Sequence, residues 1–178
     1  METVARTYQL KFSNRQILSI ALPICLAILV PQFNYITNNI FLGHLDEQSL
    51  AAAGITGVYY LIFAVIGNGL NNGLQALISR RAGENRIDEI GKLFHEGIRV
   101  AFIIAGIGVL TTYLLAPLIM RYSLSSPVLQ EQVIRFLKIR IWGLPFLYIY
   151  QLRNALLIST NQSKYLVYGT ASETVANI

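Results

Sequence analysis

The sequence predicts an all-α integral membrane protein, and two observations carry the prediction. Long uncharged apolar stretches lie between Arg15 and His44 and between Glu47 and Arg80. Each exceeds the roughly 20 residues that a helix needs to cross about 30 Å of hydrocarbon. The composition agrees, because 54% of the 178 residues are hydrophobic and 13% are charged, whereas about 25% of the residues in soluble domains are charged.

Five membrane-spanning helices are expected after a cytoplasmic N-terminal segment at 1–15. The first span, 16–43, is too long for the apolar core of a signal peptide, which has roughly 7–15 residues, so it should remain attached and cross the membrane. The second span is expected at 49–79. The third, at 100–120, contains small residues that permit close helix packing: Ala101, Ala105, Gly106 and Gly108.

The fourth span, expected at 132–158, has a weaker signal, because only 141–152 is free of charge. Pro145 should bend this helix, since proline removes a backbone donor and clashes with the preceding turn. Basic side chains are expected near both ends of the span: Arg135, Lys138 and Arg140 at one end and Arg153 at the other. Arg153 is expected to extend toward water.

The fifth apolar segment, 165–178, follows Lys164. Its roughly fourteen residues rise only about 21 Å, which is less than the thickness of the hydrocarbon. We therefore expect a truncated fifth helix, and a partial transmembrane lobe over 16–178.

The distribution of lysine and arginine predicts the orientation in the membrane. Most of the 14 basic residues fall in alternate connections: the N-terminal segment, the loop after the second span and the loop after the fourth. We therefore expect a multi-pass protein of the cell inner (plasma) membrane with a cytoplasmic N-terminus. The net charge of +5 is accounted for by loops that face anionic lipid, so no nucleic-acid partner is expected.

Polar side chains within the spans are the candidate functional residues, because such groups are costly in hydrocarbon. Asn34 and Asn38 lie four residues apart on one face of the first span, where Pro31 permits a bend. In the second span, four amides follow the i, i+3, i+4, i+7 pattern of one helix face and suit a water-filled substrate cavity: Asn68, Asn71, Asn72 and Gln75. The alternative for both groups is hydrogen bonding between packed helices.

Glu173 is the only acidic residue within an expected span. It lies about 13.5 Å into the fifth helix, counted from Lys164, close to the middle of the bilayer. Ionising a carboxyl group there is costly, so Glu173 suits the binding and release of a coupling proton, and Asn177 follows on the same face. The alternative is that Glu173 pairs with a buried arginine.

Several motifs resemble the multidrug and toxic compound extrusion (MATE) transporters. They are TNNIFLGHL at 37–45 with LAAAG at 50–54, LISRRAGE at 77–84 with Ile90-Gly91, Gly-Leu-Pro at 143–145, and Asn177-Ile178. The resemblance implies a twelve-helix antiporter of two six-helix lobes, which exports organic cations or similar amphiphiles in exchange for H+ or Na+. This chain would supply most of the N-terminal lobe, and a missing C-terminal lobe would be its partner.

In that family an acidic residue of the first helix and an Asn and an Asp of the fifth help to build a cation site. Asn177 matches the Asn, whereas Asn38 stands in place of the first-helix acid. Since an amide cannot exchange a proton at physiological pH, our hypothesis is that Glu173 supplies the titratable group.

Two other functions remain open. One is a flippase for lipid-linked sugars of the same superfamily. Basic residues in a central cavity would favour it, but the sequence offers only Arg153, near a helix end. The other is a transport-inactive fragment or assembly partner. An enzyme is not expected, because His44 and His95 fall in separate loops and no residue set has metal-ligand spacing. We expect no cofactor and no metal beyond the coupling ion.

Overall fold

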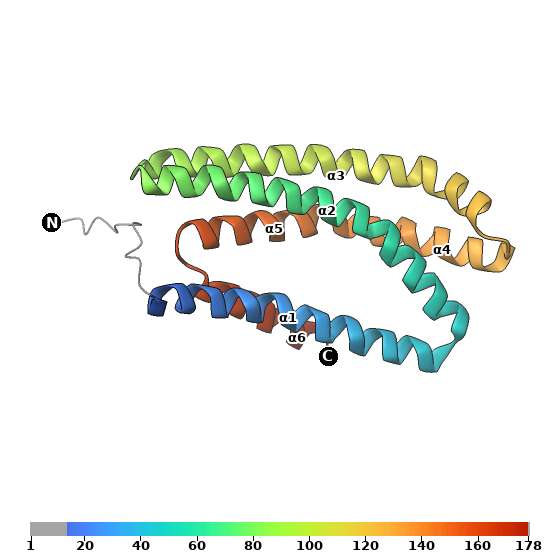
Figure 1. Cartoon of the computed structure of the whole chain (residues 1–178). Helices are drawn as coiled ribbons and strands as arrows, with labels where there is room; N and C mark the ends of the chain where they lie inside the picture. Colours follow the sequence, from blue (N-terminus) through green and yellow to red (C-terminus); the bar gives the residue numbers. More distant parts are fainter. Residues whose placement is uncertain (1–13, 178) are drawn as a thin grey trace.

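The structure, a computed structural model, describes residues 14–177 (Figure 1). Every element in this range is helical, which confirms the all-α prediction. Its helices are α1 (Asn14–Leu45), α2 (Glu47–Gly83), α3 (Ile87–Ser123), α4 (Pro127–Arg140), the 3₁₀ turn η1 (Ile141–Gly143), α5 (Leu144–Ser159) and α6 (Lys164–Asn177). Three stretches are long and apolar enough to cross a membrane: Ile17–His44, Glu47–Gly83 and Ile87–Ser123.

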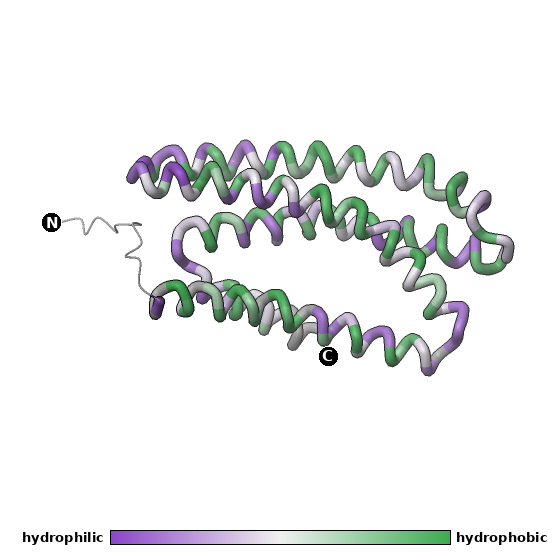
Figure 2. Tube along the Cα trace, in the orientation of Figure 1, coloured by the Kyte–Doolittle hydropathy of each residue, from purple (hydrophilic) through white to green (hydrophobic). Residues whose placement is uncertain are grey.

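The helices form two groups (Figure 1). Helices α2, α3, α4 and α5 pack against one another, while α1 packs mainly against α6. The groups diverge from the corner where α1 joins α2. Hydrophilic residues gather at this corner and at the α2–α3 connection, whereas the middle of the long helices is largely hydrophobic (Figure 2).

Local sequence explains where α2 and α3 begin. Asp46 is extended, and its carboxylate accepts a hydrogen bond from the backbone N–H of Ser49 at 3.3 Å, so an N-cap starts α2 immediately after α1. The connection to α3 contains Asn85 with φ 58°. Asparagine adopts this left-handed conformation more readily than most residues, which allows the chain to reverse within a short turn.

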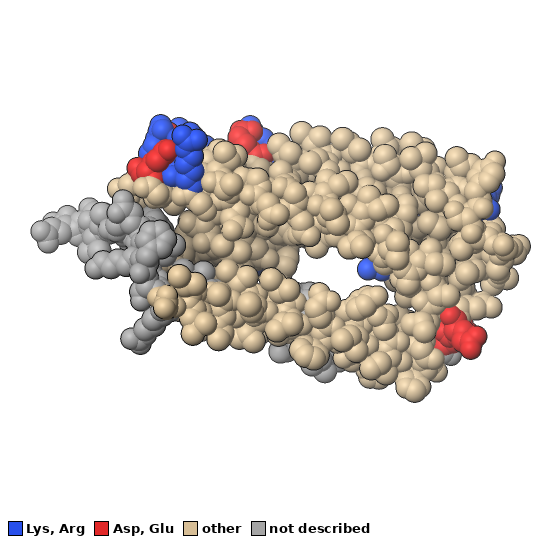
Figure 3. All heavy atoms as spheres, in the orientation of Figure 1, with Lys and Arg blue, Asp and Glu red and all other residues tan. Residues whose placement is uncertain are grey.

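Ion pairs tie together the two sides of the α2–α3 connection, where Figure 3 shows basic and acidic side chains gathered. Arg81 contacts Glu84 at 2.7 Å and Glu89 at 2.9 Å, and Arg80 contacts Glu84 at 3.0 Å. Arg86 also pairs with Glu89. Hydrogen bonds from Arg81 and Arg80 hold the pKa of the Glu84 carboxyl below its ordinary value. The charges of this connection therefore largely neutralise one another.

Helices α2 and α3 are antiparallel along most of their length. The hydroxyl of Tyr59 donates to that of Thr112 at 3.2 Å, and further along α2 the side chain of Leu74 lies directly against Gly97. Gly97 has no side chain, so the two helices can approach closely, as small residues allow in membrane proteins.

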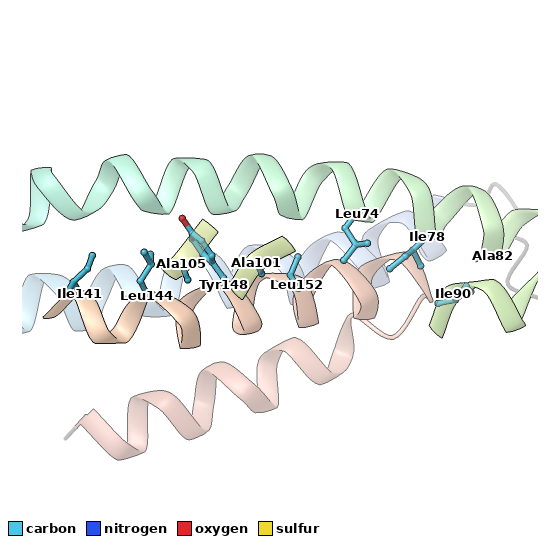
Figure 4. Packing of buried hydrophobic residues seen from close by; sticks show 10 residues of the cluster. All are labelled: Leu74, Ile78, Ala82, Ile90, Ala101, Ala105, Ile141, Leu144, Tyr148 and Leu152. Carbon is cyan, nitrogen blue, oxygen red and sulfur yellow. The ribbon is translucent and has the colours of Figure 1, made fainter. Parts of the chain in front are cut away.

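Helices α2 and α5 run parallel, and their contacts keep a nearly constant offset. Tyr148 donates to the carbonyl of Phe63 at 2.9 Å, and Ser159 donates to the carbonyl of Gln75 at 3.0 Å. The buried core lies between these helices and α3 (Figure 4). Its members are Leu74, Ile78, Ala82, Ile90, Ala101, Ala105, Ile141, Leu144, Tyr148 and Leu152.

The α-helix of the fourth segment is interrupted where Pro145 predicts a disturbance. The 3₁₀ turn η1 separates α4 from α5, and Pro145 lies in the first turn of α5. A proline is tolerated there because its missing N–H would have no intrahelical acceptor. The segment begins well before position 132, because Ser126 caps α4 and Pro127 opens it.

Candidate functional site

The structure is hollowed between α1 on one side and α2 and α4 on the other (Figure 3). The larger cavity, about 440 Å³, contains the side chain of Arg140 and is called the Arg140 cavity. It is lined by Tyr35, Asn38, Asn39, Phe41, Leu42, Ala53, Phe136 and Arg140. A second cavity of about 360 Å³ adjoins it and shares Leu42, Ala53 and Phe136. The second cavity contains Arg135, so both are lined by a basic residue of α4.

Arg140 is held by three contacts, two with α2 and one with Phe136 of its own helix. Its Nη1 donates to the hydroxyl of Thr56 at 3.4 Å. The guanidinium carbon Cζ lies 5.0 Å from the centre of the Tyr60 ring and 5.9 Å from that of Phe136, which is within cation–π range. The two aromatic rings thus stabilise the positive charge of the guanidinium, and the side chain of Arg140 faces the cavity.

Arg140 is the last residue of α4, but it lies farther along the fourth segment than the expected span at 132–158 places it. Because α4 begins at Pro127, Arg140 lies about 20 Å along the segment. The signal for this start is present in the sequence, since Ser followed by Pro is typical of an N-cap and first helical residue. Hydropathy alone does not find it, because Gln130, Glu131 and Gln132 interrupt the apolar residues at the start of α4.

Arg153 also departs from the expectation that it extends to water. The residue is half-buried, its guanidinium lies over the ring of Tyr150 at 5.5 Å, and its Nε is buried without a hydrogen-bond partner. The guanidinium also lies against Gly169 of α6. Helix α6 therefore covers a side chain that would otherwise have reached solvent.

The candidate residues of α1 are only partly brought into the cavity. Asn38 lines it together with its neighbour Asn39. Asn34 is half-buried, does not line the cavity and interacts with another group of the protein. Helix α1 continues through position 31, and the side chain of Pro31 lies outside the described residues. The side chains of Glu173 and Asn177, on α6, also lie outside them.

The four amides expected on one face of α2, here called the amide stripe, are directed partly toward α5. Asn68 accepts a hydrogen bond from Nε2 of Gln151 at 3.1 Å. Asn71 is half-buried and donates to Asn72 at 3.5 Å, while Asn72 itself is exposed. Gln75 accepts from α5 through its backbone carbonyl rather than its side chain. These residues line neither the Arg140 cavity nor the cavity that adjoins it.

Four buried side-chain atoms on α2 and α5 have no hydrogen-bond partner in the described part of the chain. They are Oδ1 of Asn71, Oε1 of Gln151, Nε of Arg153 and Oδ1 of Asn154. Unpaired buried polar atoms are costly in a packed interior, and within a membrane they mark places where water or solute can enter. Sequence reasoning singled out Asn71 but missed Gln151 and Asn154, because both belong to a segment that reads as a weak span.

Long apolar helices around a hollow that contains polar and basic side chains are typical of membrane transport proteins. The MatE family model matches residues 23–178. The chain therefore belongs to the MatE family, the multidrug and toxic compound extrusion transporters that its motifs resemble.

Relatives of this chain are named as multidrug resistance proteins. It is 25% identical over 141 residues to the probable multidrug resistance protein NorM of Buchnera aphidicola, covering 79% of this chain and 31% of the relative. It is 26% identical over the same shares to MdtK of Yersinia enterocolitica. A probable NorM of Synechocystis is 23% identical over 100% of this chain and 38% of the relative. The chain thus spans about one third of the length of these relatives.

Two solved structures share the fold. A MOP superfamily transporter from Pyrococcus furiosus, described as having a binding pocket of reverse polarity, matches with a TM-score of 0.79 at 17% identity. An outward-facing multidrug resistance MATE family transporter matches with a TM-score of 0.77 at 18% identity. Each comparison covers 91% of this chain and 37% of the other.

Proposed function

We propose that this chain belongs to a secondary antiporter that exports drugs or organic cations in exchange for H+ or Na+. The observation that carries the proposal is the hollow between α1 and helices α2 and α4, whose largely apolar wall contains amide and basic side chains, in a chain whose relatives are named for multidrug resistance. A C-terminal lobe, as in the longer relatives, would complete the path. We place the protein in the inner (plasma) membrane with its N-terminus in the cytoplasm.

The proposed coupling residues lie on two helices that contact each other. Asn34 and Asn38 belong to α1, Glu173 and Asn177 belong to α6, and α1 packs mainly against α6. A carboxyl group on this pair of helices would bind the coupling proton, and amide oxygens beside it would coordinate Na+. Binding of the ion would then compete with binding of substrate in the hollow.

The amide stripe of α2 is proposed as a further part of the substrate path. Asn72 is exposed in the structure, and Oδ1 of Asn71 is buried without a hydrogen-bond partner. Both amides can therefore offer hydrogen-bonding groups to water or to a passing substrate. Asn68 and Gln75 would hold the wall of the path, since both are joined to α5.

Transport in inside-out membrane vesicles tests the proposal. Vesicles that contain the protein, expressed from its own gene, are loaded with acid or with Na+, and uptake of ethidium into the lumen is followed by fluorescence. We expect uptake that requires one of the two ion gradients. Glu173→Gln should abolish proton-driven uptake, while Glu96→Gln, which alters an exposed residue paired with Arg99, should not. Normal proton-driven uptake by the Glu173 variant would sink the coupling hypothesis.

The position of Arg140 favours a second candidate, a flippase for lipid-linked sugars. Such lipids carry phosphate, and a basic residue in the cavity is the feature expected of a protein that moves them. Arg140 meets that requirement. Translocation of a fluorescent phospholipid-linked sugar across proteoliposomes, without a need for an H+ or Na+ gradient, would separate this candidate from the antiporter.

A further inference from the structure

Arg140 carries a positive charge that no described acidic group neutralises. Ion pairs occur elsewhere, at the α2–α3 connection and between Arg99 and Glu96, but Arg140 is in none of them. Its one hydrogen bond, to Thr56, uses a single N–H at 3.4 Å. A guanidinium has five N–H donors, so most of the donors of Arg140 have no acceptor among the side chains that the structure describes.

Counted from the α1–α2 corner at Asp46, these donors lie deeper than the interfacial layer of a bilayer. Thr56, the contact of Arg140 on α2, is ten residues from the corner at Asp46, or about 15 Å along the helix. Asn38, on the opposite wall, is eight residues from the same corner, or about 12 Å. The interfacial layer on each side of a bilayer is only about 5–8 Å thick. An unpaired arginine at this level is costly unless it faces a cavity that an anion or water enters.

The cavity around Arg140 suits the anionic end of an amphiphile. Asn38 and Asn39 offer amide N–H donors from α1, while Tyr35 and Phe41 offer apolar and aromatic surface. Aromatic surface binds the apolar body of a ligand, and a planar guanidinium binds carboxylate or phosphate oxygens in pairs. No aspartate or glutamate is among the described residues that line either this cavity or its neighbour.

The adjoining cavity is also lined by a basic residue and by side chains that can donate hydrogen bonds. Arg135 lines it together with Gln132 and Ser49. A ligand that passes between the cavities would remain next to one of the two guanidinium groups. A purely cationic substrate would meet repulsion from both, whereas an anionic group would meet attraction.

We propose that the Arg140 cavity binds the carboxylate or phosphate group of an amphiphile. The proposal rests on the proposed transport function, and it names one class of substrate for the Arg140 cavity, amphiphiles that carry such a group. Arg140 would be the residue that determines this specificity, with Tyr60 and Phe136 holding its guanidinium in place.

Binding measurements on the protein in phosphatidylcholine nanodiscs test the proposal. The probes are fluorescein, which carries a carboxylate, phosphatidylglycerol with a fluorescent label, and the cation ethidium. Arg140→Gln should weaken at least one of the two anionic probes about tenfold or more, which corresponds to the loss of a charged hydrogen bond. Ethidium should bind as before or more tightly. Arg140→Lys should recover part of the binding, since it keeps the charge but loses the planar fork.

Lys138→Gln provides the matched control. Lys138 lies on the same helix, but its Nζ is over the ring of Tyr113, on the α3 side and away from the cavity. The control should bind all three probes like the wild type. If Arg140→Gln weakens the binding of fluorescein alone, the substrate is a soluble carboxylate. If it weakens the binding of phosphatidylglycerol alone, the ligand is a lipid headgroup. Either result supports the proposal.

Three results would overturn it: wild-type affinity of both anionic probes for Arg140→Gln, equal weakening by Lys138→Gln, or failure of both anionic probes to bind the wild type. None of these depends on transport. If vesicles show gradient-driven uptake but Arg140→Gln does not change anion binding, the proposed function stands and the inference is rejected. If Arg140→Gln weakens anion binding but vesicles show no gradient-driven uptake, the inference stands and the proposed function is rejected.

Discussion

Tyr148 of α5 donates a hydrogen bond to the backbone carbonyl of Phe63 on α2, with the oxygen atoms 2.9 Å apart. The side chain of Tyr148 is 1% exposed, so this bond lies inside the core that unites α2, α3 and α5. It fixes the parallel register of α2 and α5 near the start of α5. The packing of the neighbouring residues on both helices depends on this register.

Tyr148→Phe should destabilise the protein by about 1 kcal/mol, the usual net contribution of one hydrogen bond. The ring is retained, so the packing of the core is unchanged. Thermal unfolding of the purified protein in detergent measures the effect. Tyr168→Phe, at a position that is 70% exposed, is the control and should leave the midpoint unchanged. Equal midpoints for the two variants would show that the Tyr148 bond adds no net stability.

Gly67→Ala should be more harmful, because α5 lies directly against this glycine. A Cβ at position 67 would meet Cε1 of Tyr148 at 2.5 Å and would collide with Oε1 of Gln151. Forcing an extra carbon into a packed core costs about 1–3 kcal/mol. Gly69→Ala, two residues away and with open space around its Cβ, should instead be neutral or stabilising by up to about 1 kcal/mol. Similar unfolding midpoints for the two variants would contradict the close contact between α2 and α5 at Gly67.

Asn68→Ala tests how the amide stripe is used. The amide of Asn68 accepts from Gln151, and interhelical hydrogen bonds within membranes contribute about 0.6 kcal/mol on average. We expect a small loss of stability from Asn68→Ala and none from Asn72→Ala, because Asn72 accepts its hydrogen bond from Asn71 of the same helix, at 3.5 Å, and not from another helix. Ethidium uptake should respond in the opposite order, with the larger loss at Asn72. A larger stability loss at Asn72 would mean that both amides serve packing.

Hydropathy predicts the apolar centre of each long helix but misses the helical residues outside it. The third span was expected at 100–120, whereas α3 begins at Ile87. The first turns of α3 carry many charges, yet Ile90 and Gly97 are buried and Gly97 lies against Leu74 of α2. Packing against a neighbouring helix therefore extends α3 into a region that an apolar window excludes.

The candidate site was predictable only in part, for a related reason. Asn38 stands out because an amide is unusual in an apolar stretch, and it lines the cavity. Arg140 was expected near one end of the fourth span. Its depth could not be predicted, because the depth depends on where α4 begins and on which helix faces Arg140. The contacts with Thr56 and Tyr60 come from α2, a helix far from Arg140 in the sequence. One sequence contains no signal for such a pairing.

The ion pairs of the α2–α3 connection make stability depend on pH in a defined direction. Hydrogen bonds from Arg81 and Arg80 lower the pKa of Glu84 in the folded protein from its ordinary value of 4.5. The stabilisation is therefore fully present above the unfolded pKa and is lost as the pH falls through the lower folded value. Glu84→Gln should reduce the unfolding midpoint at pH 7 by a few degrees at most, since exposed ion pairs contribute little. The difference from the wild type should disappear in strong acid and shrink in high salt. A difference that persists unchanged at low pH would assign the effect to lost packing rather than to charge.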